Sequence, residues 1–346
     1  MTVPVLILDP AKSPIAVALA SDHVRLTLET FFKAEVRNPN TRRAYQNGAK
    51  DFFVYLSACS HVDTLEAINA MQVSGWLDAM QARGLSTPTI KQRLAGLRRM
   101  FNALVRAQVL RVNPAAVVRG PTHSVRKGKT PVLTGAQTQQ LLNGIDTSTL
   151  LGLRDRAMIA VMAYSFARIG AVTALQIRHT FRQQGRLWLR LSEKGGNSHD
   201  VPCHHHLETY LAEWLAAVGH ADKPLAPLFQ TFTWEPKPKP TCSSVDPSTP
   251  RQADTSTRQR RILSGQPMTQ AMTWEMLQRR ANAAGIDTAV CNHTFRATGI
   301  TAYLTHGGTI ERAAVIAGHR STRTTQLYDR RADDVTLDEI EKIRFV

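Results

Sequence analysis

Residues 293–331 read HTFRATGITAYLTHGGTIERAAVIAGHRSTRTTQLYDRR, and the polar residues of this stretch decide how the whole chain is interpreted. His293 and Arg296 are three positions apart, so a helix would place them on one face, where both can address a single ligand. His319 follows a glycine, and Tyr328 comes nine residues after His319. Glycines between the apolar segments predict short helices separated by turns.

Two basic residues upstream complete a pattern. Arg168 lies in the segment FARIG, and Lys194 lies in the segment EKGGNS. The Lys194 segment follows the apolar run LWLRL and precedes Val201, which predicts a strand, a glycine-containing turn and a second strand. An isolated H-x-x-R motif more often lies on an ordinary protein surface than in a functional site. Six such residues in this order are a specific signal.

In this order the residues resemble the signature of the tyrosine recombinases, the phage-integrase and Xer-type site-specific DNA recombinases. The resemblance implies a metal-independent and ATP-independent enzyme, without a cofactor, that cuts and rejoins DNA strands through a 3′-phosphotyrosyl intermediate. It also implies that the protein acts as a homotetramer on two DNA duplexes. Free in solution, the protein could be a monomer. The family's usual acidic residue, three positions after the first arginine, is replaced here by Ala171. The catalytic residues that the resemblance assigns are Arg168, Lys194, His293, Arg296, His319 and Tyr328.

The chemistry of strand cleavage gives these residue types distinct roles. Charge develops on the non-bridging oxygens of the phosphate, and the guanidinium forks of Arg168 and Arg296 match such oxygens. A phenol is ionised in about one part in a thousand at pH 7, a cost of ~4 kcal/mol, so Tyr328 needs a base, for which we expect His293. Lys194 would protonate the leaving 5′-oxygen, and a second imidazole, that of His319, would bond to the scissile phosphate.

The pattern of helix signals and turn residues divides the chain into segments. The sequence predicts a mainly α fold with a small antiparallel β-sheet in two domains, and the resemblance implies that a helical core-binding domain precedes a catalytic domain. The prolines and polar residues of 222–267 predict a long loop. The predicted segments are a ragged N-terminus (1–21), a helical core-binding, SAM-like domain (22–112), a basic linker (113–131), the catalytic domain (132–335) and a C-terminal helix (336–346).

Helix starts are predicted from capping residues. We expect Asn40 to cap the second helix of the core-binding domain, and Thr87 to cap the fourth with Pro88 as its first residue. Thr134 and Gln137 have the spacing of a capping box that opens the catalytic domain. The C-terminal helix would present one apolar face, made of Leu337, Ile340 and Ile343, for docking on a neighbouring protomer.

The charge balance indicates a nucleic-acid partner. Lys and Arg number 43 against 27 Asp and Glu, a formal net charge of +16. Between positions 85 and 112 there are six basic residues and no acidic one, and a helix face of one sign is better explained by phosphates opposite it than by solvation. The residues that we expect to contact double-stranded DNA are Arg42, Arg43, Lys91, Arg93, Arg98, Arg99, Arg119, Arg126, Lys127 and Lys129.

Two other functions fit part of the sequence. A non-catalytic, sequence-specific DNA-binding regulator could use the short helices of 293–328, but it would not need the ordered polar residues. A metal-dependent nuclease could use the run Cys203-His204-His205-His206, but consecutive residues cannot all converge on one ion, so we expect no metal. The four cysteines lack C-x-x-C spacing, and no apolar run is long enough to span a membrane. We therefore expect a cytoplasmic protein with reduced thiols and no membrane partner.

Overall fold

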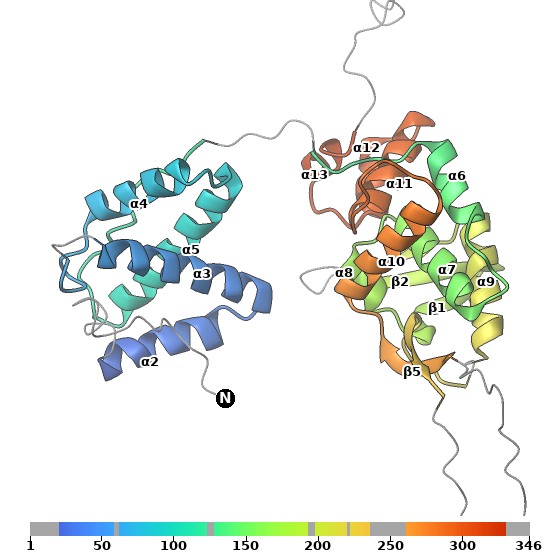
Figure 1. Cartoon of the computed structure of the whole chain (residues 1–346), viewed down its shortest axis with the longest axis horizontal. Helices are drawn as coiled ribbons and strands as arrows, with labels where there is room; N and C mark the ends of the chain where they lie inside the picture. Colours follow the sequence, from blue (N-terminus) through green and yellow to red (C-terminus); the bar gives the residue numbers. More distant parts are fainter. Residues whose placement is uncertain are drawn as a thin grey trace, which may run out of the picture. The chain divides into compact units, whose positions relative to one another are not determined.

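A computed structural model describes residues 21–58, 62–122, 128–192, 198–219, 222–235 and 261–329. The chain forms two compact units that divide between Ser124 and Val125, inside the segment predicted to be a linker. Figure 1 shows a first unit built from helices and a second that combines helices with short strands. The predicted mainly α fold with small antiparallel sheets is confirmed.

The first unit is a helical bundle around an aromatic core. Phe52 lies at its centre, and its ring makes edge contacts with those of Phe53, Trp76 and Phe101 at centroid distances of 5.5, 5.2 and 5.9 Å. The apolar residues recur at helical spacing, so each helix buries one stripe. The elements are α2 (Asp22–Thr30), a π-helix η2 (Phe31–Glu35), α3 (Pro39–Ser57), α4 (Ala70–Ala82) and α5 (Thr87–Arg106).

Two predicted helix caps of this unit are displaced. Asn38, not Asn40, caps α3, and its side chain accepts bonds from the backbone amides of positions 40 and 41. Pro39 occupies the first helical position because its ring fixes a helical φ and no amide is needed there. In α5 the cap is Ser86 rather than Thr87, so Pro88 is the second residue of the helix.

The second unit packs helices around the buried helix α7. The predicted capping box of Thr134 and Gln137 is present at the start of α6. Residues on every face of α7 are buried, so this helix forms the centre of the unit. Its helices are α6 (Gly135–Asn143), α7 (Leu150–Tyr164), α8 (Ile169–Thr173), the 3₁₀-helix η3 (Ile177–His179), α9 (His205–Val218), α10 (Gln270–Ala283), α11 (Thr294–Thr305), α12 (Ile310–Ile316) and α13 (Thr322–Gln326).

A three-stranded antiparallel sheet contains the predicted hairpin. Its strands β1 (Thr180–Gln183), β2 (Arg186–Ser192) and β3 (Ser198–Pro202) lie in the order β1-β2-β3. Alternate residues of β2 are buried, as expected for a strand with one face on the core. The sequence analysis missed β1, which is only four residues long and half exposed.

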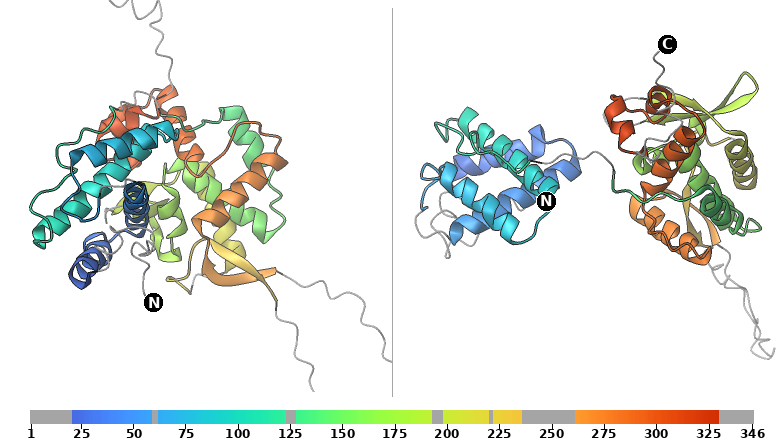
Figure 2. Two further views of the ribbon diagram at one scale, coloured as in Figure 1. Left: turned by 60° about the vertical axis from the view of Figure 1, so that its left-hand side comes forward. Right: turned by 90° about the horizontal axis from the view of Figure 1, so that it is seen from above.

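The expectation that 222–267 forms only a loop is wrong at both ends. Strands β4 (Gln230–Trp234) and β5 (Arg261–Pro267) pair antiparallel and lie side by side at one edge of the second unit (Figure 2). The buried Arg154 anchors them, because it donates to the Gln230 carbonyl at 2.9 Å and lies 4.9 Å from the centre of the Phe232 ring. Five of the eight prolines that suggested a loop lie between the two strands, outside the described residues.

Two further predictions concern membrane-spanning segments and the C-terminal helix. None of the helices that the structure describes combines the length and the apolar character needed to cross a bilayer. The predicted C-terminal helix, with Leu337, Ile340 and Ile343, lies outside the described residues.

Candidate active site

Arg296 joins three segments that are distant in the sequence. It is the third residue of α11, is fully buried, and lies one turn after His293, the residue that precedes the helix. Its Nη1 donates to the Phe166 carbonyl, and its Nη2 donates to the Ala317 carbonyl at 2.7 Å and to Nε2 of His319 at 2.6 Å. The guanidinium therefore fixes the ends of α7 and α12 relative to α11.

Phe166 contributes to this arrangement through its backbone. Its φ of 53° lies in the left-handed region, which a non-glycine residue seldom adopts, and this turns its carbonyl toward Arg296. Its ring packs in a small cluster with Ile300 and Leu304 of α11. The sequence analysis missed Phe166, because nothing in a phenylalanine indicates a left-handed backbone.

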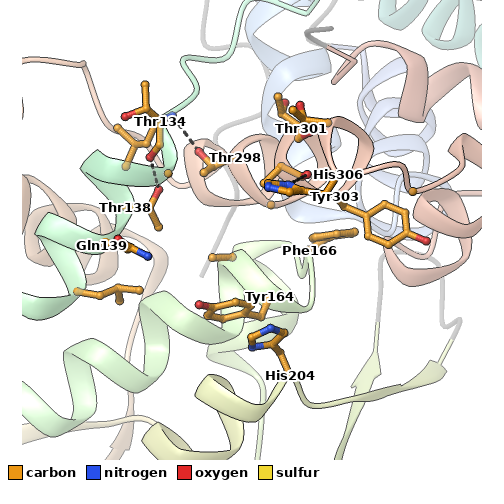
Figure 3. A pocket seen from close by; sticks show the side chains of 18 of the residues that line it. Thr134, Thr138, Gln139, Tyr164, Phe166, His204, Thr298, Thr301, Tyr303 and His306 are labelled. Carbon is orange, nitrogen blue, oxygen red and sulfur yellow. Dashed lines mark hydrogen bonds between the residues drawn. The ribbon is translucent and has the colours of Figure 1, made fainter.

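Close packing between α7 and α11 supports the same geometry. A Cβ on Gly299 would lie 1.9 Å from the Ala163 carbonyl and 2.8 Å from the Phe166 ring, so only glycine fits there. The Phe166 ring also lines a cavity of ≈ 840 Å³ between α6, α7 and α11, in which Tyr164 stacks on His204 at 4.6 Å (Figure 3). Phe166 thus links the buried arginine to the wall of this cavity.

His319 is held as a neutral imidazole. Arginine can only donate, so Nε2 of His319 accepts from Arg296, and Nδ1 carries the proton and donates to Oγ1 of Thr325 at 2.9 Å. Burial, together with the charges of Arg296 and Arg168, lowers the pKa of His319 to about 3. The predicted bond from His319 to a phosphate therefore requires its contact with Arg296 or with Thr325 to rearrange when DNA binds.

The depressed pKa of His319 predicts loss of stability in acid. Between pH 6.5 and about pH 3 the unfolded chain binds a proton at this histidine that the folded chain does not, so the free energy of unfolding falls as the pH falls below 6.5. Urea unfolding at pH 7 and pH 5 should show a larger loss for the wild type than for His319→Asn. Equal losses in the two proteins would contradict the assignment.

Arg168 and His293 lie at the same place. Arg168 immediately precedes α8, and its charge lowers the pKa of both His293 and His319, which requires proximity to both. For His293, whose ring stays accessible to solvent, partial burial is the largest cause, followed by the charges of Arg296 and Arg168. A histidine with a lowered pKa is neutral at pH 7 and can accept a proton.

Tyr328 completes the cluster. Its ring lies 5.9 Å from that of His319, at an interplanar angle of 15°, and packs against the apolar cluster around Phe166. Its backbone is fixed twice, because its amide donates to the Thr325 carbonyl and its carbonyl accepts from Oγ1 of Thr301, both at 2.9 Å. The structure therefore brings together five of the six predicted catalytic residues. The sixth, Lys194, lies outside the described residues, in the connection between β2 and β3.

The predicted DNA contacts fall into two groups. Arg93 pairs with Asp51 at 3.0 Å, Arg98 donates to backbone carbonyls, Arg42 donates to the Val36 carbonyl at 3.1 Å, and the guanidinium of Arg99 lies 5.8 Å from the centre of the Tyr45 ring. Some basic residues of 85–112 do have acidic partners, because α3 and η2 supply carboxylates that are distant in the sequence. The exposed members are Arg43, Lys91, Arg99, Arg119 and Lys129, of which Arg99 also has the ring contact, and Arg126 and Lys127 lie outside the described residues.

The histidine run forms an aromatic stack at the start of α9. The rings of His204 and His205 have centroids 4.0 Å apart, and His204 stacks on Tyr164. In the part of the chain that the structure describes, no three His, Cys, Asp or Glu side chains are placed to hold a metal ion. Cys203 and Cys291 are free thiols there.

Comparison with known proteins gives two family matches. Residues 131–334 match the phage integrase family, and residues 28–108 match the phage integrase N-terminal SAM-like domain. The chain belongs to the phage integrase family. Each match lies within one of the two compact units, so the family's N-terminal domain corresponds to the helical bundle and its catalytic domain to the unit with the polar cluster.

Individual proteins similar to this chain are consistent with its membership of the phage integrase family. The tyrosine recombinase XerD of Xanthomonas axonopodis pv. citri (strain 306) is 30% identical over 253 residues, which cover 72% of this chain and 73% of that protein. XerH recombinase in a post-cleavage complex with difH DNA has a TM-score of 0.66 at 17% identity, covering 96% and 89% of the two chains. A lambda integrase tetramer on a Holliday junction has a TM-score of 0.60 at 15% identity, covering 90% and 80%. These two structures are similar in fold.

Proposed function

We propose that this chain is a site-specific DNA recombinase that cuts and rejoins strands through a 3′-phosphotyrosyl intermediate. The single observation that carries the proposal is the gathering of two guanidiniums, two imidazoles and a phenol around one place in the second unit. The relatives named tyrosine recombinases support the same activity. A regulator that only binds DNA would not need a phenol ring stacked on a histidine that a buried arginine holds.

Cleavage proceeds as an in-line displacement at phosphorus. Oη of Tyr328 forms a bond to phosphorus while its proton passes to His293, and the bond from phosphorus to the 5′-oxygen breaks. Lys194 gives a proton to that oxygen, which leaves as a 5′-hydroxyl. Rejoining is the reverse step with a new 5′-hydroxyl, and because the covalent link conserves the phosphodiester bond energy, no ATP is consumed.

The electrostatics of the cluster suit this step. Partial burial, followed by the charges of Arg296 and Arg168, lowers the pKa of His293, so the base is unprotonated at pH 7. The same two guanidiniums can neutralise the charge that develops on the phosphate oxygens, and Arg296 is already fixed in place by its carbonyl partners. Pre-ordered donors of this kind need little reorganisation during the reaction.

Trapping the intermediate tests the proposal. Nicked duplexes built on inverted repeats from DNA flanking the gene, incubated with the protein in EDTA, should give a protein–DNA adduct that survives denaturation. DNA cleavage that leaves no adduct and is abolished by EDTA would indicate a metal-dependent nuclease. Retention of the correct target without any adduct would indicate a regulator.

We further propose that the helical first unit binds DNA phosphates through its exposed basic residues. Arg43→Ala and Lys91→Ala should each weaken binding and lower the slope of log K against log salt by about one, because each releases a counterion on contact. Arg98→Ala, which removes a side chain bonded to the Ala115 carbonyl at 3.0 Å, should instead lower the free energy of unfolding by about 1–3 kcal/mol. Binding titrations at several salt concentrations check this, and an affinity unchanged by salt would overturn the basic-face argument.

The working assembly is proposed to be a homotetramer on two duplexes, in the cytoplasm, acting for a mobile element or a chromosome. The lambda integrase tetramer on a Holliday junction supports such an assembly. Removing the residues after Arg331 should abolish recombination of two sites while leaving single-site DNA binding intact, because the apolar C-terminal segment would dock on a neighbour. Intact recombination by the truncated protein would contradict trans-docking.

A further inference from the structure

His199 makes an unusual connection between the sheet and the catalytic cluster. It lies in β3, and its Nε2 donates to the backbone carbonyl of Ile316, at the end of α12, at 3.0 Å. The two residues are 117 positions apart. Ile316 directly precedes Ala317, whose carbonyl accepts from Arg296. Two adjacent carbonyls therefore bind, respectively, a side chain of the sheet and the buried arginine.

The last carbonyls of α12 have no hydrogen-bond partner within the helix. The amides of Ala317, Gly318 and His319 bond back to the carbonyls of residues 313–315, and Gly318, at φ 59°, reverses the chain there. The next two carbonyls lie beyond this last turn and need partners from elsewhere, as at any helix end. His199 and Arg296 supply them.

His199 lies near the end of the β2–β3 hairpin at which the chain connects the two strands. In the register of the two strands Leu191 faces His199, and the last pair is Ser192 with Ser198, whose hydroxyls are 3.0 Å apart. One step further from the end, Asp200 accepts two bonds from Arg190, at 2.9 and 2.8 Å. The five residues that connect these strands include Lys194.

The hydrogen bond of His199 joins the β2–β3 hairpin to the end of α12. The pairs Ser192–Ser198 and Arg190–Asp200 act within the sheet, and among the contacts described here His199 is the one that fixes the sheet to the helix end holding Arg296. A side chain that only stabilised the sheet would not need to reach α12. A general acid must be placed within hydrogen-bond reach of the leaving oxygen, so the position of this hairpin relative to the phosphate matters for its protonation.

We propose that His199 is a positioning residue for protonation of the leaving 5′-oxygen. It ties the strands that flank Lys194 to the helix end that orients Arg296 and His319. It acts on the leaving-group side of the reaction and does not contact the reacting atoms. This inference rests on the proposed recombinase function and adds to it a role that the catalytic signature does not contain.

A pair of substrates separates leaving-group assistance from general damage. One suicide duplex carries the ordinary 5′-oxygen at the scissile phosphate, and the other carries sulfur at that bridging position, which leaves without a proton. Adduct formation is followed under single-turnover conditions with saturating DNA. The variants are His199→Ala, His199→Gln, Lys194→Ala and His23→Leu, the last removing an imidazole that bonds to the Ala107 carbonyl at the same 3.0 Å in the first unit.

On the oxygen substrate, Lys194→Ala should be slower by about 10²–10⁴-fold and His199→Ala by about 10–100-fold. On the sulfur substrate both should return to within a few-fold of the wild type. His199→Gln, whose amide can donate to the same carbonyl, should recover most of the rate on oxygen. His23→Leu should match the wild type on both substrates.

The outcomes distinguish the inference from the function beneath it. A His199→Ala variant that is as fast as the wild type on oxygen, or equally slow on both substrates, overturns the positioning role alone. Failure of His199→Gln to exceed His199→Ala also overturns it, because the donated bond would then be irrelevant. A wild-type protein that forms no adduct with either substrate overturns the recombinase function, and this inference with it.

Discussion

Tyr328→Phe is expected to eliminate the covalent protein–DNA adduct, a loss of at least about 10⁴-fold, while DNA retention stays as in the wild type. The substitution removes one oxygen and keeps the ring, which lies 5.9 Å from the His319 ring and packs against the cluster around Phe166. The bonds that hold residue 328 to Thr325 and Thr301 use backbone atoms, so they survive. Denaturing gels measure the adduct, and mobility shifts measure retention.

A second tyrosine provides the control. Tyr303 of α11 packs edge-on against Phe166 at 6.0 Å and belongs to the same apolar cluster. Tyr303→Phe removes a hydroxyl from the same region and should leave adduct formation unchanged. Adduct formation by Tyr328→Phe would show that another residue is the nucleophile, and its loss in both variants would point to local disruption.

The chemistry of the site could be predicted from the sequence, because residue types and their order carry it. Arg168, His293, Arg296, His319 and Tyr328 are dispersed over 161 positions, yet the structure gathers them. The elements that hold them could not be predicted in the same way. Backbone carbonyls have no residue signature, so the partners of Arg296 at Phe166 and Ala317 become visible only in three dimensions.

The basic face shows a different limit of sequence reasoning. The run of α5 without acids predicted phosphates opposite its basic residues, but ion pairs can also form between elements that are distant in the sequence. Asp51 of α3 forms an ion pair with Arg93, and Glu35 of η2 forms one with Arg106. The loop predicted for the Pro-rich segment 222–267 failed for a related reason. The prediction used the composition of the whole segment, whereas β4 and β5 pair through residues near its two ends.

Arg296→Lys should reduce cleavage by about 10²–10³-fold, although the charge is kept. The arginine fork reaches the Phe166 carbonyl with one nitrogen, and the Ala317 carbonyl and His319 with another. A single ammonium cannot hold this geometry and present a fork to a phosphate. Single-turnover adduct formation at saturating DNA measures the loss.

Stability and catalysis should separate when Arg296 is compared with another buried arginine. Arg154 is also buried, and it bonds to the Gln230 carbonyl and to Asp155, at the base of the β4–β5 ribbon. Either change to lysine leaves buried acceptors short of a donor, so each should lower the free energy of unfolding by about 1–3 kcal/mol. If Arg154→Lys slowed cleavage as much as Arg296→Lys, the effect at Arg296 would be one of folding. A cleavage defect confined to Arg296→Lys, at matched stability, would place the fork on the phosphate, because loss of packing alone would act on both variants.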